Sequence, residues 1–223
     1  MNYFSTIIPL LRDRKDFLEE IYQGIGLKSK ITALLISSSC CFAIYGAIIG
    51  AFHGPLQVVS SAIKLPALYL ITLVVCLPTL YIFNALFGSQ QSISQHLAFL
   101  LTSVSAIAIL LCGFAPVTLF FLITVNDYNF FVLLNVAIFA LTGIVGVSFL
   151  YQVMKPTGDG NSQGSKVRTN ILRFWLVLYG FVGSQLGWTL RPFFGSPGQF
   201  ELFRAREGSF LSGVLNALFN ILT

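Results

Sequence analysis

The sequence predicts an all-α membrane protein with about five transmembrane helices and an amphipathic interfacial helix at each end. Hydrophobic residues make up 56% of the 223 residues and charged residues only 9%, whereas roughly 25% of the residues in an average soluble domain are charged. Several apolar runs exceed the roughly 20 residues that a helix needs to cross a hydrocarbon core about 30 Å thick. No acidic residue occurs between Lys30 and Asp127. A soluble fold of this length could not bury so much apolar surface, so we expect a single membrane domain.

Residues 1–30 are predicted to form a cytoplasmic amphipathic segment. Within 13–23, apolar side chains recur at helical spacing opposite charged ones, a pattern typical of a helix that rests on the membrane or on a partner. The apolar residues are Phe17, Leu18, Ile21 and Tyr22, and the charged ones are Arg14, Lys15, Glu19 and Glu20.

Residues 31–190 are predicted to form the bundle of five spans. The first span, 31–52, and the second, 65–87, flank a short loop over 53–64. Pro78 removes one backbone hydrogen bond from the second span and predicts a kink there. A polar turn over 88–95 then closes a tight hairpin.

The third apolar run, 97–125, is longer than one upright span requires and contains Gly113 and Pro116 past its middle. We interpret it as one tilted, kinked helix, because two half-length helices would leave backbone groups unsatisfied in lipid. A sixth span hidden in this run is the alternative. A minimal turn over 126–129 leads to the fourth span, 130–151, which is followed by a Gly-, Ser- and Lys-rich loop over 155–170.

The fifth span, 171–190, carries aromatic and basic residues at both ends, as anchoring at the membrane interfaces predicts. Residues 191–223 are predicted to form an exit loop and an interfacial helix. Over 209–222 the apolar residues share one face, and a helix of about 21 Å at 1.5 Å per residue is too short to span. The anchoring residues of the fifth span are Arg173, Trp175, Trp188 and Arg191.

Basic residues set the predicted orientation. With five spans, eight Lys and Arg residues fall on the side of the N-terminus. The positive-inside rule then places the N-terminus in the cytoplasm and the C-terminal tail outside. We expect an integral multi-pass protein, with a bacterial inner membrane or an internal membrane favoured. The opposite side receives Lys64, Arg191, Arg204 and Arg206.

The sequence lacks the motifs that mark the common enzyme classes. It contains no H-E-x-x-H, G-x-S-x-G or Walker motif and no cluster of His and carboxylates that could hold a metal, so we expect no enzyme activity and no cofactor. The scattered net charge of +5 does not indicate binding to nucleic acid. No acidic residue lies within a predicted span, which argues against a proton-coupled transporter. His53 and His96 lie at span ends, where we expect solvated rings; axial ligation of a pigment or haem is the alternative.

Small residues are spaced for close helix packing in two spans. Gly46 and Gly50 in the first span, and Gly183 and Gly187 in the fifth, fit the small-xxx-small pattern. We interpret both pairs as internal packing sites, and self-association is the alternative.

Polar amides and an aromatic exit segment are the remaining candidate sites. Asn84, Asn135 and Gln185 lie at or inside membrane depth, where each should find a partner on another helix; a small polar cavity lined by all three is the alternative. The exit segment is expected to be either an interfacial anchor or a docking surface for a partner. Its candidate partner-binding residues are Trp188, Arg191, Phe193 and Phe194.

Two stretches support a resemblance to known families. Residues 64–88, K-L-P-A-L-Y-L-I-T-L-V-V-C-L-P-T-L-Y-I-F-N-A-L-F-G, together with the five-span plan and cytoplasmic N-terminus, resemble the Yip1-type domain of multipass membrane proteins. The stretch G-W-T-L-R-P-F-F-G-S-P at 187–197 resembles the tail of bacterial multipass proteins of unassigned function, some labelled as actin-binding. The Yip1 resemblance implies a role in membrane traffic, with prenylated small GTPases bound by a cytoplasmic N-terminal region, which has about 30 residues here.

The expected function is that of a non-enzymatic membrane scaffold or an accessory subunit of a larger membrane complex. Its expected partners are the lipid bilayer and either another membrane protein or a second copy of the chain. A small transporter or channel that uses the three amides and the helix kinks is the alternative. The two functions differ in what the amides face: a solvated cavity for transport, other helices for a scaffold.

Overall fold

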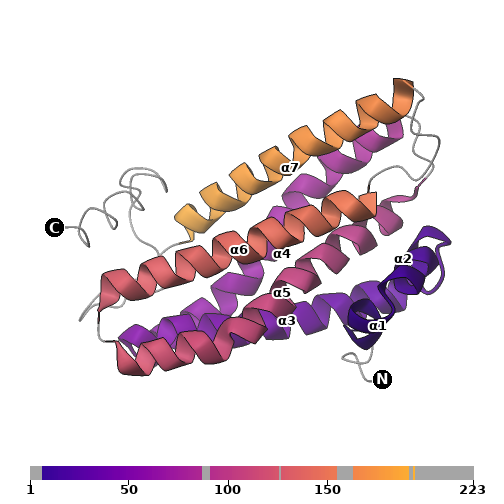
Figure 1. Cartoon of the computed structure of the whole chain (residues 1–223). Helices are drawn as coiled ribbons and strands as arrows, with labels where there is room; N and C mark the ends of the chain where they lie inside the picture. The colour runs from indigo at the N-terminus through magenta and orange to yellow at the C-terminus, as the bar shows by residue number, and fades with distance from the viewer. Residues whose placement is uncertain (1–6, 87–90, 126, 155–162, 191–192, 194–223) are drawn as a thin grey trace.

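The computed structural model describes residues 7–86, 91–125, 127–154, 163–190 and 193. Within these ranges the regular elements are all helices (Figure 1). In chain order they are α1 (Ile7–Arg12), α2 (Arg14–Tyr22), α3 (Leu27–Gly50), the 3-10 helix η2 (Ala51–His53), α4 (Pro55–Leu86), α5 (Ile93–Thr124), α6 (Tyr128–Met154) and α7 (Gln163–Thr189).

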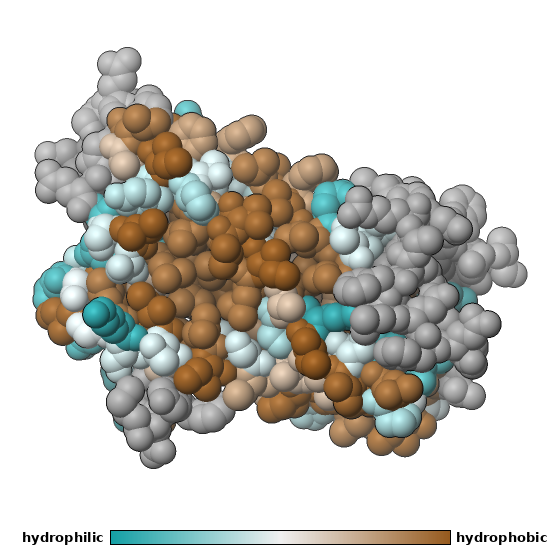
Figure 2. Space-filling view, turned by 180° about the vertical axis from the view of Figure 1, so that it is seen from behind, coloured by the Kyte–Doolittle hydropathy of each residue, from teal (hydrophilic) through white to brown (hydrophobic). Residues whose placement is uncertain are grey.

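Four of these segments are long and apolar enough to cross a membrane, which agrees with the prediction of an all-α, multi-pass membrane protein. They are 27–53, 55–86, 93–124 and 128–154. Helix α7 has 27 residues, enough to span, but is less apolar than these four. In Figure 2 the centre of the visible face is predominantly hydrophobic and the hydrophilic residues lie toward its edges.

Helix α3 lies in the most buried of the four apolar segments. It makes its most extensive contacts with α4 and α5, while α6 packs on α5 and α7 packs on α4 (Figure 1). Inside α3, 56% of the most apolar window is buried, compared with 28% in each of α4, α5 and α6. Helices α4 and α5 therefore cover much of α3, whereas α4, α5 and α6 leave most of their own apolar windows unburied.

The predicted loop over 53–64 is wrong, because α4 begins at Pro55. Only Gly54 separates η2 from α4, and its φ of 108° is one that residues with a side chain rarely adopt. Pro55 fits the first position of a helix, where a missing N–H costs nothing. Helix α4 therefore has 32 residues and contains both Pro66 and Pro78.

The third apolar run forms one helix, as interpreted from the sequence. Helix α5 continues through Pro116 and begins with a capping box, in which Ser92 and Gln95 bind each other's backbone amides. After a short turn, the Asp127 carboxylate accepts a hydrogen bond from the backbone amide of Phe130 and so caps α6. The predicted loop over 155–170 is too long, since α7 begins at Gln163.

The amphipathic face of α2 is covered by the chain itself. Phe17 and Ile21 are buried, and Gln95 of α5 donates a hydrogen bond of 2.7 Å to the carbonyl of Tyr22. The Tyr22 hydroxyl donates to the carbonyl of Val153 near the end of α6. We expected this face to rest on the membrane or on a partner, but it packs against the start of α5 and the end of α6. The predicted C-terminal interfacial helix over 209–222 lies outside the described residues.

Candidate functional site

The glycines of α3 permit direct contact between the backbones of α3 and α4. A Cβ atom added to Gly50 would lie 2.5 Å from the carbonyl oxygen of Gln57, and one added to Gly46 would lie closer still to that of Ser61. Any side chain here would force the two helices apart. Gly46 and Gly50, the α3 glycine pair, are therefore internal packing residues.

The glycines of α7 face the same helix less tightly. A Cβ atom on Gly183 would lie 3.7 Å from the Thr72 side chain, and one on Gly187 would lie 3.9 Å from the Leu68 side chain. These are ordinary van der Waals distances. Gly183 and Gly187, the α7 glycine pair, also pack inside the bundle, but the space beside them tolerates a small side chain.

A buried polar face runs along the first three turns of α4. Its residues are spaced i, i+3, i+4 and i+7, so they share one side of the helix. Lys64, which we predicted at the outer end of a loop, is instead only 6% exposed within this helix. The polar face of α4 consists of Gln57, Ser60, Ser61 and Lys64.

The backbone carbonyl of Phe193, a few residues after α7, contacts this polar face. The Gln57 side-chain amide donates a hydrogen bond of 3.1 Å to the carbonyl oxygen of Phe193. The Ser61 hydroxyl donates to the same oxygen. The Phe193 ring packs partly buried against the core. The two helices are thus joined by hydrogen bonds at the end of α7.

Among the candidate partner-binding residues, the structure describes Trp188 and Phe193. Trp188 is half-buried in the last turn of α7. Phe193 contributes its carbonyl to the contact with α4 and is therefore engaged within the chain. Arg191 and Phe194 lie outside the described residues.

A chain of buried hydrogen bonds joins α3, α5 and α6. The Tyr45 hydroxyl donates a bond of 2.7 Å to the Asn135 side-chain oxygen and lies 3.2 Å from the Thr118 hydroxyl. Since the single Tyr45 proton goes to Asn135, the Thr118 hydroxyl is the donor in the other bond. The Asn135 amide donates to the carbonyl of Phe131 in its own helix. All three side chains are buried, so this Tyr45 chain satisfies polar groups that lipid could not satisfy.

The three predicted amides do not meet. Asn135 finds a partner on another helix, as expected. Asn84 donates to the Leu80 carbonyl one turn earlier in its own helix, and Gln185 is exposed on α7. A single polar cavity lined by all three is not what the described residues form.

Both histidines differ from the expectation of solvated rings. The His96 ring is fully buried, packs edge-on against Tyr81 and lies 3.0 Å from the Ser92 carbonyl oxygen through Nδ1. His53 is half-buried and packs beside Phe52 and Tyr128 in an aromatic cluster at the opposite end of the bundle. Contacts with Ser92 in the capping turn of α5 and with Tyr81 of α4 hold the His96 ring, and sequence spacing does not reveal them.

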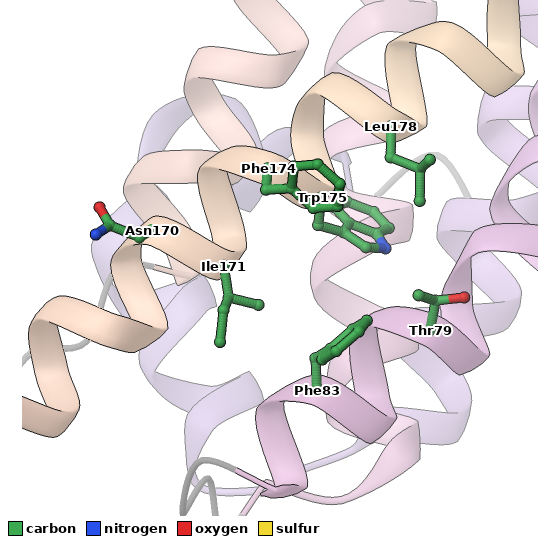
Figure 3. A pocket seen from close by; sticks show the side chains of 7 residues that line it. All are labelled: Thr79, Phe83, Asn170, Ile171, Phe174, Trp175 and Leu178. Carbon is green, nitrogen blue, oxygen red and sulfur yellow. The ribbon is translucent and has the colours of Figure 1, made fainter.

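An open apolar groove of about 410 Å³ lies between α4 and α7 (Figure 3). Trp175 was expected at the membrane interface, but its indole is buried beside the groove and donates a hydrogen bond of 3.2 Å to the Cys76 carbonyl. Phe174 is 70% exposed. The lining residues are Thr79, Phe83, Asn170, Ile171, Phe174, Trp175 and Leu178.

No group of three or more metal-ligating side chains occurs within the residues that the structure covers. Comparison with protein-family models, with curated proteins and with solved structures found no match. The resemblance to Yip1-type domains therefore stays a prediction.

Sequence reasoning missed Tyr45 and Thr118, which lie far from Asn135 in the chain and are ordinary residues of apolar helices. It also missed the polar face of α4. Here a signal was available, because Gln57, Ser61 and Lys64 recur at helical spacing within the stretch that we interpreted as a loop.

Proposed function

We propose that this chain is a non-enzymatic membrane scaffold or accessory subunit, with five spans and a cytoplasmic N-terminus. In this proposal α7 is the fifth span. Its start lies toward the same end of the bundle as the N-terminal helices (Figure 1), as expected for a fifth span that follows four crossings.

The observation that carries the proposal is the Tyr45 chain. Its polar side chains bind one another across three helices, so they serve to hold the bundle in one arrangement. The close contact between the backbones of α3 and α4 at the α3 glycine pair also holds the bundle in one arrangement. A rigid bundle of this kind suits a protein that positions a partner in the membrane.

The partner contact is proposed at the exit of α7, at Trp188 and Arg191, which lie three residues apart in the sequence. An indole can bridge apolar and polar layers, and a guanidinium can bind a carboxylate or a phosphate. Phe194 completes this surface in the proposal, whereas Phe193 packs against the core and contacts α4.

Affinity purification of the tagged full-length chain in mild detergent tests the proposal. We expect one membrane protein to co-purify in stoichiometric amount, and a Trp188→Ala, Arg191→Ala variant to lose it while remaining folded. Phe181→Ala, which removes an exposed ring from the same helix, is the matched control and should retain the partner. Purification of a monodisperse chain without any partner would contradict the accessory-subunit function.

A small transporter or channel is the second candidate, and one observation favours it. Lys64 is buried within a helix long enough to span, and ionisable residues inside spans often mark ion pathways. Reconstitution into liposomes distinguishes the two functions. Uptake driven by a proton gradient that is lost in Lys64→Met would support transport and overturn the scaffold.

A further inference from the structure

The outward face of α7 carries side chains at the spacing of a helix–helix seam. Successive members are alternately four and three residues apart over two repeats, a spacing that keeps them in line when two helices pack at a small angle. Val177 is 72% exposed and Phe181 61%. A Cβ atom added to Gly180, beside the seam, would meet no atom within 4 Å. The α7 seam consists of Asn170, Phe174, Val177, Phe181 and Ser184.

The opposite side of α7 packs on α4. The α7 glycine pair faces Thr72 and Leu68, and the Trp175 indole donates its hydrogen bond to the Cys76 carbonyl. These contacts place α7 alongside the apolar segment 65–86 of α4. The α7 seam is therefore turned away from the bundle, at the depth of a helix that is long and apolar enough to cross a membrane.

Gln185 places an amide on the flank of this seam, one helical turn after Phe181. The side chain is exposed and forms no hydrogen bond with the residues that the structure describes. The α7 glycine pair brackets Gln185 and packs on Thr72 and Leu68, so the amide lies roughly five residues, or about 8 Å, inside the apolar segment of α4. An amide at that depth finds no hydrogen-bond partner in lipid, which favours a second helix beside it.

The chemistry of the seam fits a second copy of the chain. A side-chain amide contains both donors and an acceptor, so two Gln185 side chains can each donate to the other. Copies of a membrane protein share one orientation in the bilayer, so two copies related by a two-fold axis meet with their α7 helices parallel. In parallel packing at this spacing each seam residue lies opposite its own copy. The two amides then lie at the same depth.

We infer that the α7 seam is the interface of a homodimer, in which two parallel α7 helices pack together and the two Gln185 side chains exchange hydrogen bonds. The inference rests on one part of the proposed function, that α7 lies in the membrane beside α4. It does not use the partner contact at the exit of α7. In the dimer α7 is covered by α4 on one side and by its own copy on the other.

Self-association of the purified full-length chain in phosphatidylcholine liposomes tests the interface. Energy transfer between copies labelled with a donor and an acceptor should exceed that of randomly placed chains, and it should fall as the protein is diluted with lipid. Gln185→Leu should raise the protein-to-lipid ratio at half-maximal transfer by about threefold or more, as expected for the loss of hydrogen bonds between helices.

Removal of an aromatic ring tests the seam itself. Phe181→Ala should also raise the protein-to-lipid ratio at half-maximal transfer. Phe120→Ala is the matched control, because it removes a ring of nearly equal exposure, 60%, from α5, and it should leave that ratio unchanged. Random energy transfer at every dilution, or equal ratios for the two variants, would overturn the inference.

Cysteine cross-linking tests the register and the identity of the occupant. In membranes that contain the full-length chain, Val177→Cys should give a disulfide-linked dimer on treatment with copper phenanthroline, since parallel packing places the two cysteines opposite each other. Ile144→Cys, at a residue of α6 that is 68% exposed, should give no more dimer than the unaltered chain, which carries the exposed Cys40. Equal yields at both positions, or a cross-link from Val177→Cys to a different protein, would overturn the assignment of a second copy.

Failure of this inference is distinguishable from failure of the proposed function. Trp188→Ala with Arg191→Ala should abolish co-purification of the partner and keep the energy transfer between copies. Phe181→Ala should weaken the energy transfer and keep the partner. Loss of energy transfer in the first variant would overturn the assignment of the dimer to the α7 seam alone.

Discussion

Removal of the Tyr45 hydroxyl should destabilise the bundle from its centre. In Tyr45→Phe the Asn135 side-chain oxygen loses its 2.7 Å hydrogen bond, and both groups are buried where water cannot replace the donor. The Thr118 hydroxyl loses its acceptor but can turn toward a carbonyl of its own helix, as threonines in helices commonly do. Most of the loss in stability therefore comes from one buried acceptor, the Asn135 side-chain oxygen, that is left without a donor.

Two estimates give the range of the loss in the free energy of unfolding. A buried polar group left without a partner costs about 1–3 kcal/mol, whereas hydrogen bonds between helices in a bilayer average about 0.6 kcal/mol and reach about 1.7. We expect a loss of about 1–2 kcal/mol. At roughly 2–4 °C per kcal/mol for a chain of this size, the midpoint should fall by about 2–8 °C.

The assay is thermal unfolding of the purified chain in mild detergent, followed by the monodisperse fraction on size exclusion. Tyr81→Phe is the matched control, because the Tyr81 hydroxyl forms no hydrogen bond with the residues that the structure places. Thr118→Val should cost less than Tyr45→Phe, and the double variant should cost less than the sum, because both changes remove the same bond. A midpoint for Tyr45→Phe equal to that of the control would refute the reasoning.

Three other predictions concern packing, topology and transport. Replacing both residues of the α3 glycine pair by leucine should lower the folded yield more than the same change in the α7 glycine pair, because the former displaces backbone; equal yields on fluorescence size exclusion would contradict this. A reporter fused at Lys166 should indicate the cytoplasm, and one fused at Thr223 should indicate the opposite compartment. Finding both reporters on one side would contradict the five-span topology. Liposomes containing the purified chain should show neither proton-driven uptake nor a pH-dependent current, since no acidic residue lies within a span.

The apolar helices could be predicted because long apolar runs have few alternatives in a bilayer. The continuity of α5 through Pro116 followed from the same argument. The start of α4 could not be placed this way, since Gln57, Ser61 and Lys64 resemble a loop by composition although they face protein. Hydropathy measures affinity for lipid and does not register a polar surface that another helix covers.

The contacts of the candidate site were harder to predict than the helices. The pattern over 13–23 identified the apolar face of α2 but not its partner, because a helical face of Phe17 and Ile21 fits lipid and protein equally well. The Tyr45 chain depends on the register between three helices, which distances along the sequence do not specify. Asn135 was identified because an amide at membrane depth requires a partner wherever it lies.

The one-residue connection at Gly54 has a consequence for how the chain enters the membrane. Because only Gly54 separates η2 from α4, we expect α3 and α4 to enter together as a hairpin, whose turn crosses the bilayer first in the proposed orientation. Beyond Lys64, α4 contains residues 65–86, which at 1.5 Å per residue form about 33 Å of helix and match a hydrocarbon core of about 30 Å. Drawing the Lys64 ammonium back into the core would cost about 2.5–3.5 kcal/mol at its centre on insertion scales. In the proposed orientation, we therefore expect Lys64 to limit how deeply the hairpin enters the bilayer.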